Sequence, residues 1–195
     1  MRRKLNAFGL ILALLLGGCR SPLPISGTND TPTPEAAAPA LAFDSDQEAI
    51  DHFRQVTGVA DLPLDNLGPN TMINSPHGDL LVTMYQDGKQ GRYLVALQDH
   101  ILVEYFGIVN TDEATPDALT DQDLSDRALQ IALALVPDFD ILKGKLEYSE
   151  GNKLGLHFYD WRSTNSTEWT TPPFVQVGLL RSGEVFAYSN TITTK

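Results

Sequence analysis

The sequence contains little cysteine, and this scarcity limits its chemistry. Cys19 is the only cysteine among 195 residues. From residue 20 onward the chain has no thiolate for nucleophilic catalysis or for a zinc site, and no internal disulfide can form. Exported proteins that use cysteine structurally tend to carry it in pairs, so the lone Cys19 needs a different explanation.

Well-known catalytic and cofactor motifs are also missing. The chain has no Gly-x-Ser-x-Gly elbow, no P-loop, no dinucleotide-binding glycine pattern and no His-Glu-x-x-His zinc motif. Its histidines are far apart, and none belongs to a pair with metal-ligand spacing. They are His52, His77, His100 and His157. The sequence therefore predicts no catalytic residue, no metal site and no cofactor.

The N-terminal residues have the pattern of an export signal. Residues 2–4 are Arg-Arg-Lys, and an apolar run extends from Phe8 to Leu16. A membrane-spanning helix needs about 20 apolar residues, so this run has the length of a signal peptide. The following Leu16-Gly17-Gly18-Cys19 resembles the lipobox of bacterial lipoprotein precursors. The resemblance implies removal of residues 1–18, diacylation of Cys19 and anchoring outside the cytoplasm, with inner or outer membrane left open. The alternative is an ordinary signal peptide with a cysteine near its cleavage point.

Positive charge is scarce once the signal is removed. Loss of residues 1–18 removes three positive charges and no negative one, which leaves 11 Lys and Arg against 25 Asp and Glu, a net charge of −14. Such a surface repels nucleic acid, which is therefore not an expected partner. Residues 20–42 contain five prolines and no aromatic residue. We expect residues 19–42 to be the lipidated cysteine and a disordered, extended tether.

From Phe43 onward, the hydrophobic pattern predicts an α+β fold. A helix is expected near 45–57, because Ile50, Phe53 and Val56 share one face and Gly58 follows. A second helix is expected near 122–136, with Ser125 as a cap and a proline after its end. The expected antiparallel strands lie at 79–85, 91–97, 101–106, 145–149, 154–159, 174–180 and 184–190. Gly88 and Gly151 lie among the expected turn residues.

The two halves of this pattern are similar to one another. Residues 93–97 and 102–105 parallel residues 174–179 and 185–188 at an offset of about 82 positions. We interpret the chain as two helix-plus-antiparallel-hairpin units forming a tandem repeat, 43–110 and 111–195. Chance similarity between amphipathic hairpins is the competing interpretation.

Several segments resemble the PepSY and YcdB/YcdC-type repeat family of bacterial exported proteins. They are Ser125-Asp126-Arg127-Ala128, Phe158-Tyr159-Asp160-Trp161, Val175-Gln176-Val177 and Gly183-Glu184-Val185 with Tyr188. The match covers roughly residues 120–190 well and 45–106 weakly. It implies helices packed on an antiparallel sheet and a binding or protease-modulating accessory role. It carries over no catalytic residue, and the first half lacks the tryptophan at the strand end.

An acidic stretch precedes the second helix, with carboxylates at residues 112, 113, 117, 121, 123 and 126. It lacks the Asp-x-Asp-x-Asp-Gly turn of a calcium loop, so we expect no tight calcium site. Negative charge at a helix start complements the helix dipole, which explains Asp121, Asp123 and Asp126 without a ligand.

A polar segment from Asp160 to Pro173 is the candidate binding loop. It carries both tryptophans, Trp161 and Trp169, together with Arg162 and several hydroxyl residues. Long loops are often functional, and tryptophan is enriched at binding hot spots. The alternative is that both rings cover the edge of the core.

These observations favour a non-enzymatic, membrane-tethered binding or accessory module. The lipid anchor supplies contact with the membrane, and an envelope protein, a peptide or a glycan is the expected partner. One alternative is a structural spacer in the envelope. Another is an unrecognised hydrolase that uses a carboxylate pair such as Asp138 and Asp140.

Overall fold

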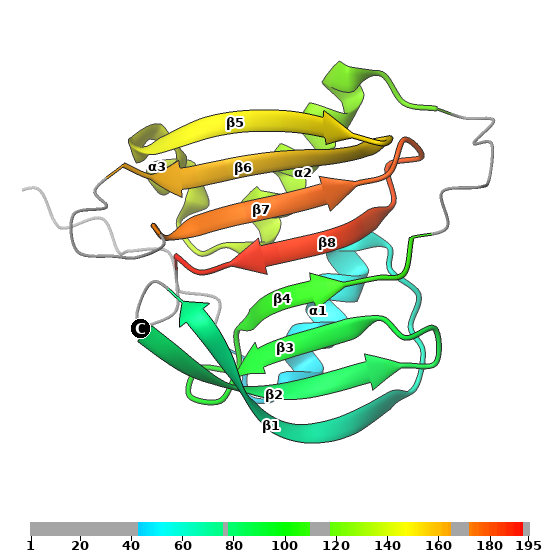
Figure 1. The fold of residues 1–195 in the computed structure, drawn as a ribbon, viewed down its shortest axis with the longest axis vertical. Helices are drawn as coiled ribbons and strands as arrows, with labels where there is room; N and C mark the ends of the chain where they lie inside the picture. The colour runs from blue at the N-terminus through cyan, green and yellow to red at the C-terminus, as the bar shows by residue number, and fades with distance from the viewer. Residues whose placement is uncertain (1–42, 76–77, 110–117, 165–171, 193–195) are drawn as a thin grey trace, which may run out of the picture. The chain divides into compact units, whose positions relative to one another are not determined.

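The computed structural model describes residues 43–75, 78–109, 118–164 and 172–192. These ranges form an α+β fold in which helices cover an antiparallel sheet (Figure 1). The elements are α1 (Asp46–Thr57), β1 (Leu64–Ser75), β2 (Gly78–Asp87), β3 (Arg92–Ala96), β4 (Leu102–Phe106), α2 (Asp121–Leu135), α3 (Phe139–Leu142), the 3₁₀ turn η1 (Lys143–Lys145), β5 (Leu146–Lys153), β6 (Leu156–Ser163), β7 (Phe174–Leu179) and β8 (Val185–Asn190).

Helix α1 begins and ends where the sequence predicts. The Ser45 side chain accepts a hydrogen bond from the Glu48 amide, which satisfies one of the free N–H groups of the first turn. Gly58 ends the helix with φ of 79°, a left-handed conformation that glycine adopts without steric cost. Ile50 and Phe53 lie on the face that enters the core.

The N-cap of helix α2 lies earlier in the chain than expected. Thr120, and not Ser125, is the N-cap, and it forms a reciprocal capping box with Asp123. The helix itself, Asp121–Leu135, nevertheless lies close to the predicted 122–136. The capping box satisfies two backbone N–H groups before the apolar face starts. The helix ends at Leu135, just before Pro137, as expected.

The eight described strands form one sheet in the order β1-β2-β3-β4-β8-β7-β6-β5. Every neighbouring pair is antiparallel, which confirms the expected strand direction. The two halves of the chain meet where β4 pairs with β8, and Figure 1 shows the two strands side by side at the middle of the sheet. The facing residues are Glu104 with Ser189, Tyr105 with Tyr188 and Phe106 with Ala187.

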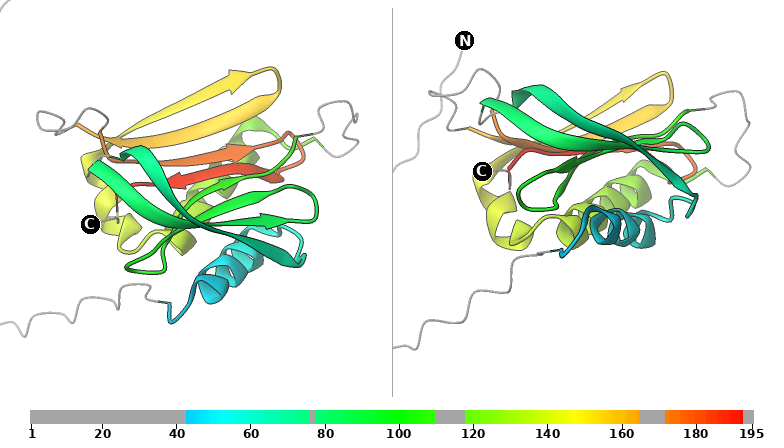
Figure 2. Two further views of the ribbon diagram at one scale, coloured as in Figure 1. Left: turned by 60° about the horizontal axis from the view of Figure 1, so that its bottom comes forward. Right: turned by 90° about the horizontal axis from the view of Figure 1, so that it is seen from below.

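Separate helix-plus-hairpin units are not confirmed. Each half supplies four strands, and the strands of both halves belong to the same sheet. Both α1 and α2 lie on one face of that sheet (Figure 2). A single hydrophobic core lies between the helices and the sheet and draws residues from both halves, among them Phe53 and Tyr93 from the first and Leu124 and Val177 from the second.

Strand β1 was not predicted from the sequence. Gly68 has φ of 87° and lies beside a register shift, and Pro69 lacks a backbone N–H, so the segment does not have the pattern of a regular strand. An edge strand accommodates both features because one of its sides has no pairing partner. β1 pairs with β2 and is at the end of the sheet.

The turn between β5 and β6 lies at Leu154–Gly155, not at residues 150–152. Both turn residues have positive φ, 56° and 78°, which matches the right-handed twist of a two-residue hairpin. Lys153 faces Leu156 across this turn. The prediction favoured Gly151 as a turn residue, whereas this glycine lies within the ladder, opposite Phe158.

Candidate functional site

A cleft of about 330 Å³ opens at one end of the strands, where several connections meet. Its walls come from the α1–β1 connection, the β2–β3 turn, the end of β4 and the β7–β8 turn. Apolar side chains form most of the lining, including Val59, Leu62 and Ile108. The polar side chains are Asp87, Lys89, Tyr105 and Glu184. We call this site the Tyr105 cleft.

Tyr105 places an unused hydroxyl in this cleft. The residue is 5 % exposed, and its ring packs against Phe53 at 4.9 Å and Tyr93 at 4.8 Å between centroids. The hydroxyl has no hydrogen-bond partner among the described residues. Every fully buried polar side-chain atom in the described part does have a partner, so the exposed part of Tyr105 includes its hydroxyl. The hydroxyl therefore opens into the cleft, where it is available to form a hydrogen bond with a ligand.

Gly107 provides the space in front of this hydroxyl. A Cβ atom at residue 107 would lie 2.7 Å from the Tyr105 oxygen, closer than such atoms approach. Burial raises the pKa of Tyr105 far above its usual value, and the charges of Asp87 and Glu184 raise it further. The hydroxyl is therefore protonated at neutral pH and can both donate and accept a hydrogen bond.

A buried polar network lies behind the cleft and fixes its wall. Arg54 is 4 % exposed and directs Nε to the Tyr93 hydroxyl at 3.4 Å, and that hydroxyl donates to Asp87 Oδ2 at 3.2 Å. Arg54 also donates to Asp61 Oδ1 and to the Leu62 carbonyl, both at 2.8 Å. Burial and, to a smaller degree, Asp87 raise the pKa of Tyr93 to about 12, although Arg54 opposes this.

Asp87 stabilises the β2–β3 turn, which forms one rim of the Tyr105 cleft. Its Oδ1 accepts hydrogen bonds from the backbone amides of Lys89 at 2.9 Å and Gly91 at 2.8 Å. Residue 91 has to be small, because a Cβ atom there would lie 2.7 Å from Asp87 Oδ2. The carboxylate is therefore held by the turn and by Tyr93, in an arrangement that suits a structural acidic group at the cleft wall.

Arg127 of α2 connects two further parts of the wall. It donates from Nε to the Gly183 carbonyl at 2.6 Å and from Nη2 to the Thr57 carbonyl at 3.1 Å. The β7–β8 turn and the end of α1 are thereby tied to the same side chain. Hydrogen bonds from buried and half-buried side chains therefore hold the backbone segments that form the cleft in place.

A second cleft of about 190 Å³ lies between the start of α2 and the β5–β6 hairpin. Its lining includes Asp121, Glu150, Asn152, His157 and Tyr159. His157 Nε2 lies 3.3 Å from Asn152 Nδ2 and 3.5 Å from Arg181 Nη1. Arg181 also binds Asp121 and lowers its pKa by this hydrogen bond. These polar groups satisfy one another, which suits a structural role.

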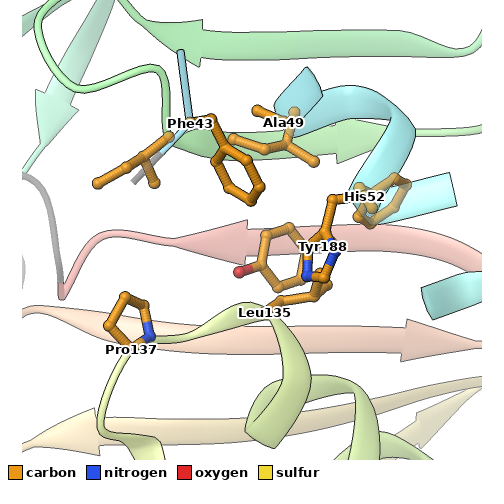
Figure 3. Close-up of a pocket in the computed structure, with 9 residues that line it drawn as sticks. Phe43, Ala49, His52, Leu135, Pro137 and Tyr188 are labelled. Atoms are coloured by element: carbon orange, nitrogen blue, oxygen red, sulfur yellow. The ribbon is translucent and has the colours of Figure 1, made fainter. Parts of the chain in front are cut away.

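A third space is too small for an organic ligand. It has a volume of about 20 Å³ and lies between α1, α2 and the sheet. Figure 3 shows Phe43, His52, Leu135 and Tyr188 around it. A cavity of this size holds about one water molecule.

The residues of the candidate binding loop are only partly described. Trp161 lies on β6 and is buried, with its ring 5.3 Å from Phe139 and 5.4 Å from Tyr148. Its ring faces the core, which agrees with the alternative interpretation that the tryptophans of this loop cover the core edge. Arg162 is half-buried, binds Asp160 at 3.1 Å and stacks over Phe174 at 4.8 Å. Trp169 lies outside the described residues, and so do Cys19 and the tether 20–42.

The carboxylate candidates do not line a described cleft as a pair. Asp138 and Asp140 are both exposed, and Asp138 precedes the short helix α3. Asp123 serves the capping box with Thr120, and these hydrogen bonds lower its pKa. In the described ranges no group of three or more His, Cys, Asp or Glu side chains is arranged to hold a metal ion. Residues 112, 113 and 117 lie outside them.

Sequence reasoning missed the Tyr105 cleft. Its polar side chains come from positions 87, 89, 105 and 184, which only the folded sheet brings together. The Asp87-Gly88 pair indicated a turn, and nothing in the sequence indicated a binding site at these positions. Among the described helices none is long and apolar enough to cross a membrane.

No family model, no curated protein and no solved structure matches the chain. Its function is therefore inferred from its own residues and their geometry.

Proposed function

We propose that the chain is a lipid-anchored extracytoplasmic protein whose folded part is a non-enzymatic binding or accessory module. The signal-like residues 1–18 and the lone Cys19 support the anchor. Diacylation gives stable membrane attachment, whereas one acyl chain gives only marginal attachment. The tether 20–42 would then hold the α+β fold away from the membrane surface.

The observation that carries the binding role is the free hydroxyl of Tyr105 in a supported cleft. Binding sites are usually concave and largely apolar, with a few convergent polar groups. The Tyr105 cleft has apolar walls, one unused hydroxyl and the carboxylate of Glu184. It lacks a nucleophile with an adjacent base, so the residues suit recognition and not turnover. The partner would be an envelope protein, a peptide or a glycan, and not nucleic acid.

We also propose that the two halves descend from one α+β unit, in line with the resemblance to the PepSY and YcdB/YcdC-type repeats. Tyr105 and Tyr188 support this idea, because the sequence offset makes them equivalent and they face each other across β4 and β8. Equivalent residues pair in this way when a two-fold axis passes between two strands. On this proposal each unit is a helix followed by four strands, and the family resemblance favours a protease-modulating role.

Two other functions remain as alternatives. An envelope spacer would need the fold for assembly only, and the Tyr105 cleft would have no ligand. A hydrolase using Asp138 and Asp140 would need a substrate cleft beside these exposed carboxylates, and the described clefts are lined by other residues. The binding role is the better supported of the three.

The anchor and the binding role are tested separately. Intact-mass spectrometry of the membrane-extracted protein should show a diacylated Cys19, and Cys19→Ala should release the chain from the membrane fraction. An unmodified Cys19 in the mature protein would remove the localisation proposal.

For the binding role, the full chain and its Tyr105→Phe variant are cross-linked in intact envelopes. A defined partner should be recovered with the wild type and with the control Tyr148→Phe, and lost with Tyr105→Phe. Recovery of bulk wall polymer by all three proteins would favour the spacer. Turnover of an ester, peptide or glycoside by purified protein would favour the hydrolase.

A further inference from the structure

The charges around the Tyr105 cleft indicate which ligand it suits. The lining of the cleft includes two carboxylates, Asp87 and Glu184, and among the described lining residues one cation, Lys89. Arg54, in the network behind the cleft, is bound to Asp61 at 2.8 Å. A site with this excess of negative charge, on a chain with a net charge of −11, favours a cation.

The two carboxylates of the cleft, Asp87 and Glu184, differ in whether they already accept hydrogen bonds from the protein. Asp87 is buried and already accepts hydrogen bonds from Lys89, Gly91 and Tyr93. Glu184 is exposed on the β7–β8 turn, and no hydrogen bond to its carboxylate occurs within the described residues. Glu184 is therefore the carboxylate that can receive a ligand, while Asp87 adds to the potential from behind.

Lys89 is the lining residue whose charge opposes a cation. It is an exposed residue of the β2–β3 turn, so its ammonium group can extend into water while its stem covers the rim. Removing this positive charge should strengthen the binding of a cation, whereas removing the Tyr105 hydroxyl or the Glu184 charge should weaken it.

We propose, on the basis of the binding function above, that the Tyr105 cleft takes an alkylammonium group. The ammonium would donate hydrogen bonds to the Tyr105 hydroxyl and to the Glu184 carboxylate. Its aliphatic stem would lie against the apolar wall that includes Val59, Leu62 and Ile108. A lysine side chain of a protein or peptide and a free aliphatic amine share this chemistry.

The test compares three probes that differ only in the end of one side chain. They are the Nα-acetyl, N-methylamide derivatives of lysine, of the neutral norleucine and of the anionic glutamate. Each is titrated into the full chain in nonionic detergent, and NMR shifts of residues around the cleft are followed. The lysine probe should bind at least about tenfold more tightly than norleucine, because hydrogen bonds from a charged donor are the stronger ones. The glutamate probe should be the weakest.

Four variants assign the effect to residues, and a fifth serves as the control. Tyr105→Phe and Glu184→Gln should each weaken the lysine probe by about tenfold. Lys89→Gln should strengthen it, and Glu147→Gln, on the exposed strand β5, is the control that should leave it unchanged. Gly107→Ala should block the hydroxyl sterically and weaken both the lysine and the norleucine probes. Thermal melts check that each variant is folded.

The outcomes separate this inference from the proposed function. Equal affinity for the lysine and norleucine probes, or a preference for glutamate, would overturn the alkylammonium inference and leave a binding cleft. Absence of cleft shifts with all three probes would overturn both. Cadaverine, titrated in parallel, distinguishes the two sources. Tight binding of cadaverine supports a free amine, and binding of the lysine probe alone supports a protein side chain.

Discussion

At the scale of single residues, two buried tyrosines of the same core differ in what their hydroxyls do. The Tyr93 hydroxyl accepts from Arg54 and donates to Asp87, whereas the Tyr105 hydroxyl has no partner in the described part. The two residues face each other across β3 and β4, and their rings are 4.8 Å apart between centroids. Nearly the same environment therefore contains one structural hydroxyl and one that is free to bind.

This difference predicts unequal effects for the same substitution. Tyr93→Phe should lower the free energy of unfolding by about 1–3 kcal/mol, because Arg54 and Asp87 each lose a buried hydrogen-bond partner. Tyr105→Phe should change it by less than about 0.5 kcal/mol, because no intramolecular hydrogen bond is lost. Urea denaturation of both variants measures the difference. A large loss for Tyr105→Phe would mean that its hydroxyl is structural.

Glu104 pairs with Leu94, which packs against the small apolar cluster on the sheet face away from the helices. Burial raises the pKa of Glu104 above the usual value of 4.5. The charge of Arg92 opposes this shift to a smaller degree. The folded state therefore holds this proton more tightly than the unfolded state does. The contribution of Glu104 to stability is fully present below the unfolded pKa and is lost as the pH rises through the folded pKa.

Glu104→Gln should remove this loss of stability. We expect the variant to be more stable than the wild type at about pH 8, and the difference to shrink as the pH falls toward about 4. Urea denaturation over this range measures it, with the exposed Glu147→Gln as the matched control. A variant that is less stable than the wild type at the higher pH would show that the carboxylate is favourably paired.

At the scale of elements, Gly58 and Gly88 offer a matched test of the α1 boundary. Gly58 ends α1 with φ of 79°, and Gly88 lies in the β2–β3 turn without a positive φ. A methyl group added at either position would have no atom within 4 Å, so only the backbone conformation differs. Gly58→Ala should cost about 1–2 kcal/mol of stability, and Gly88→Ala less than about 0.5 kcal/mol. Equal losses in thermal melts would contradict this account.

The elements that the sequence predicted are those with local signals. Ser45 and Gly58 mark the ends of α1, and alternating apolar residues mark β2 to β4 and β6 to β8. β1 was missed because Gly68 and Pro69 interrupt its pattern, and α3 because four residues show no helical period. Helix α2 lies close to the predicted 122–136, and only its N-cap was assigned wrongly, to Ser125 in place of Thr120, because the capping box lies outside the apolar face.

The candidate site was not predictable for a different reason. The two tryptophans of the loop 160–173 indicated a binding site there, yet Trp161 belongs to a strand and faces the core. Tyr105 looked like any aromatic residue of an alternating strand. Its distinction is a missing hydrogen bond in a cleft, which depends on where the β2–β3 and β7–β8 turns lie after folding. No spacing along the chain encodes that.

At the scale of the whole molecule, strand pairing, hydrogen bonds and a common core join the two halves. The ladder between β4 and β8 joins them through three facing residue pairs, and Arg127 of the second half binds the Thr57 carbonyl of the first. His52 of α1 also lies 3.3 Å from the Ala134 carbonyl of α2. One hydrophobic core runs beneath both helices. The apolar faces of both halves therefore contribute to the same core.

This shared core predicts a single cooperative unfolding transition. Ile50 on α1 and Ile131 on α2 are buried members of the same core, one from each half. Ile50→Val and Ile131→Val should each cost about 0.5–1.5 kcal/mol and lower the same transition, by about 2–4 °C for each kcal/mol. Scanning calorimetry should give equal calorimetric and van't Hoff enthalpies for the wild type and both variants. Two transitions, each lowered by only one of the substitutions, would show instead that the halves fold as independent units. In that case the Tyr105 cleft, whose walls come from both halves, would open before the chain unfolds, and ligand binding would be lost at the lower transition.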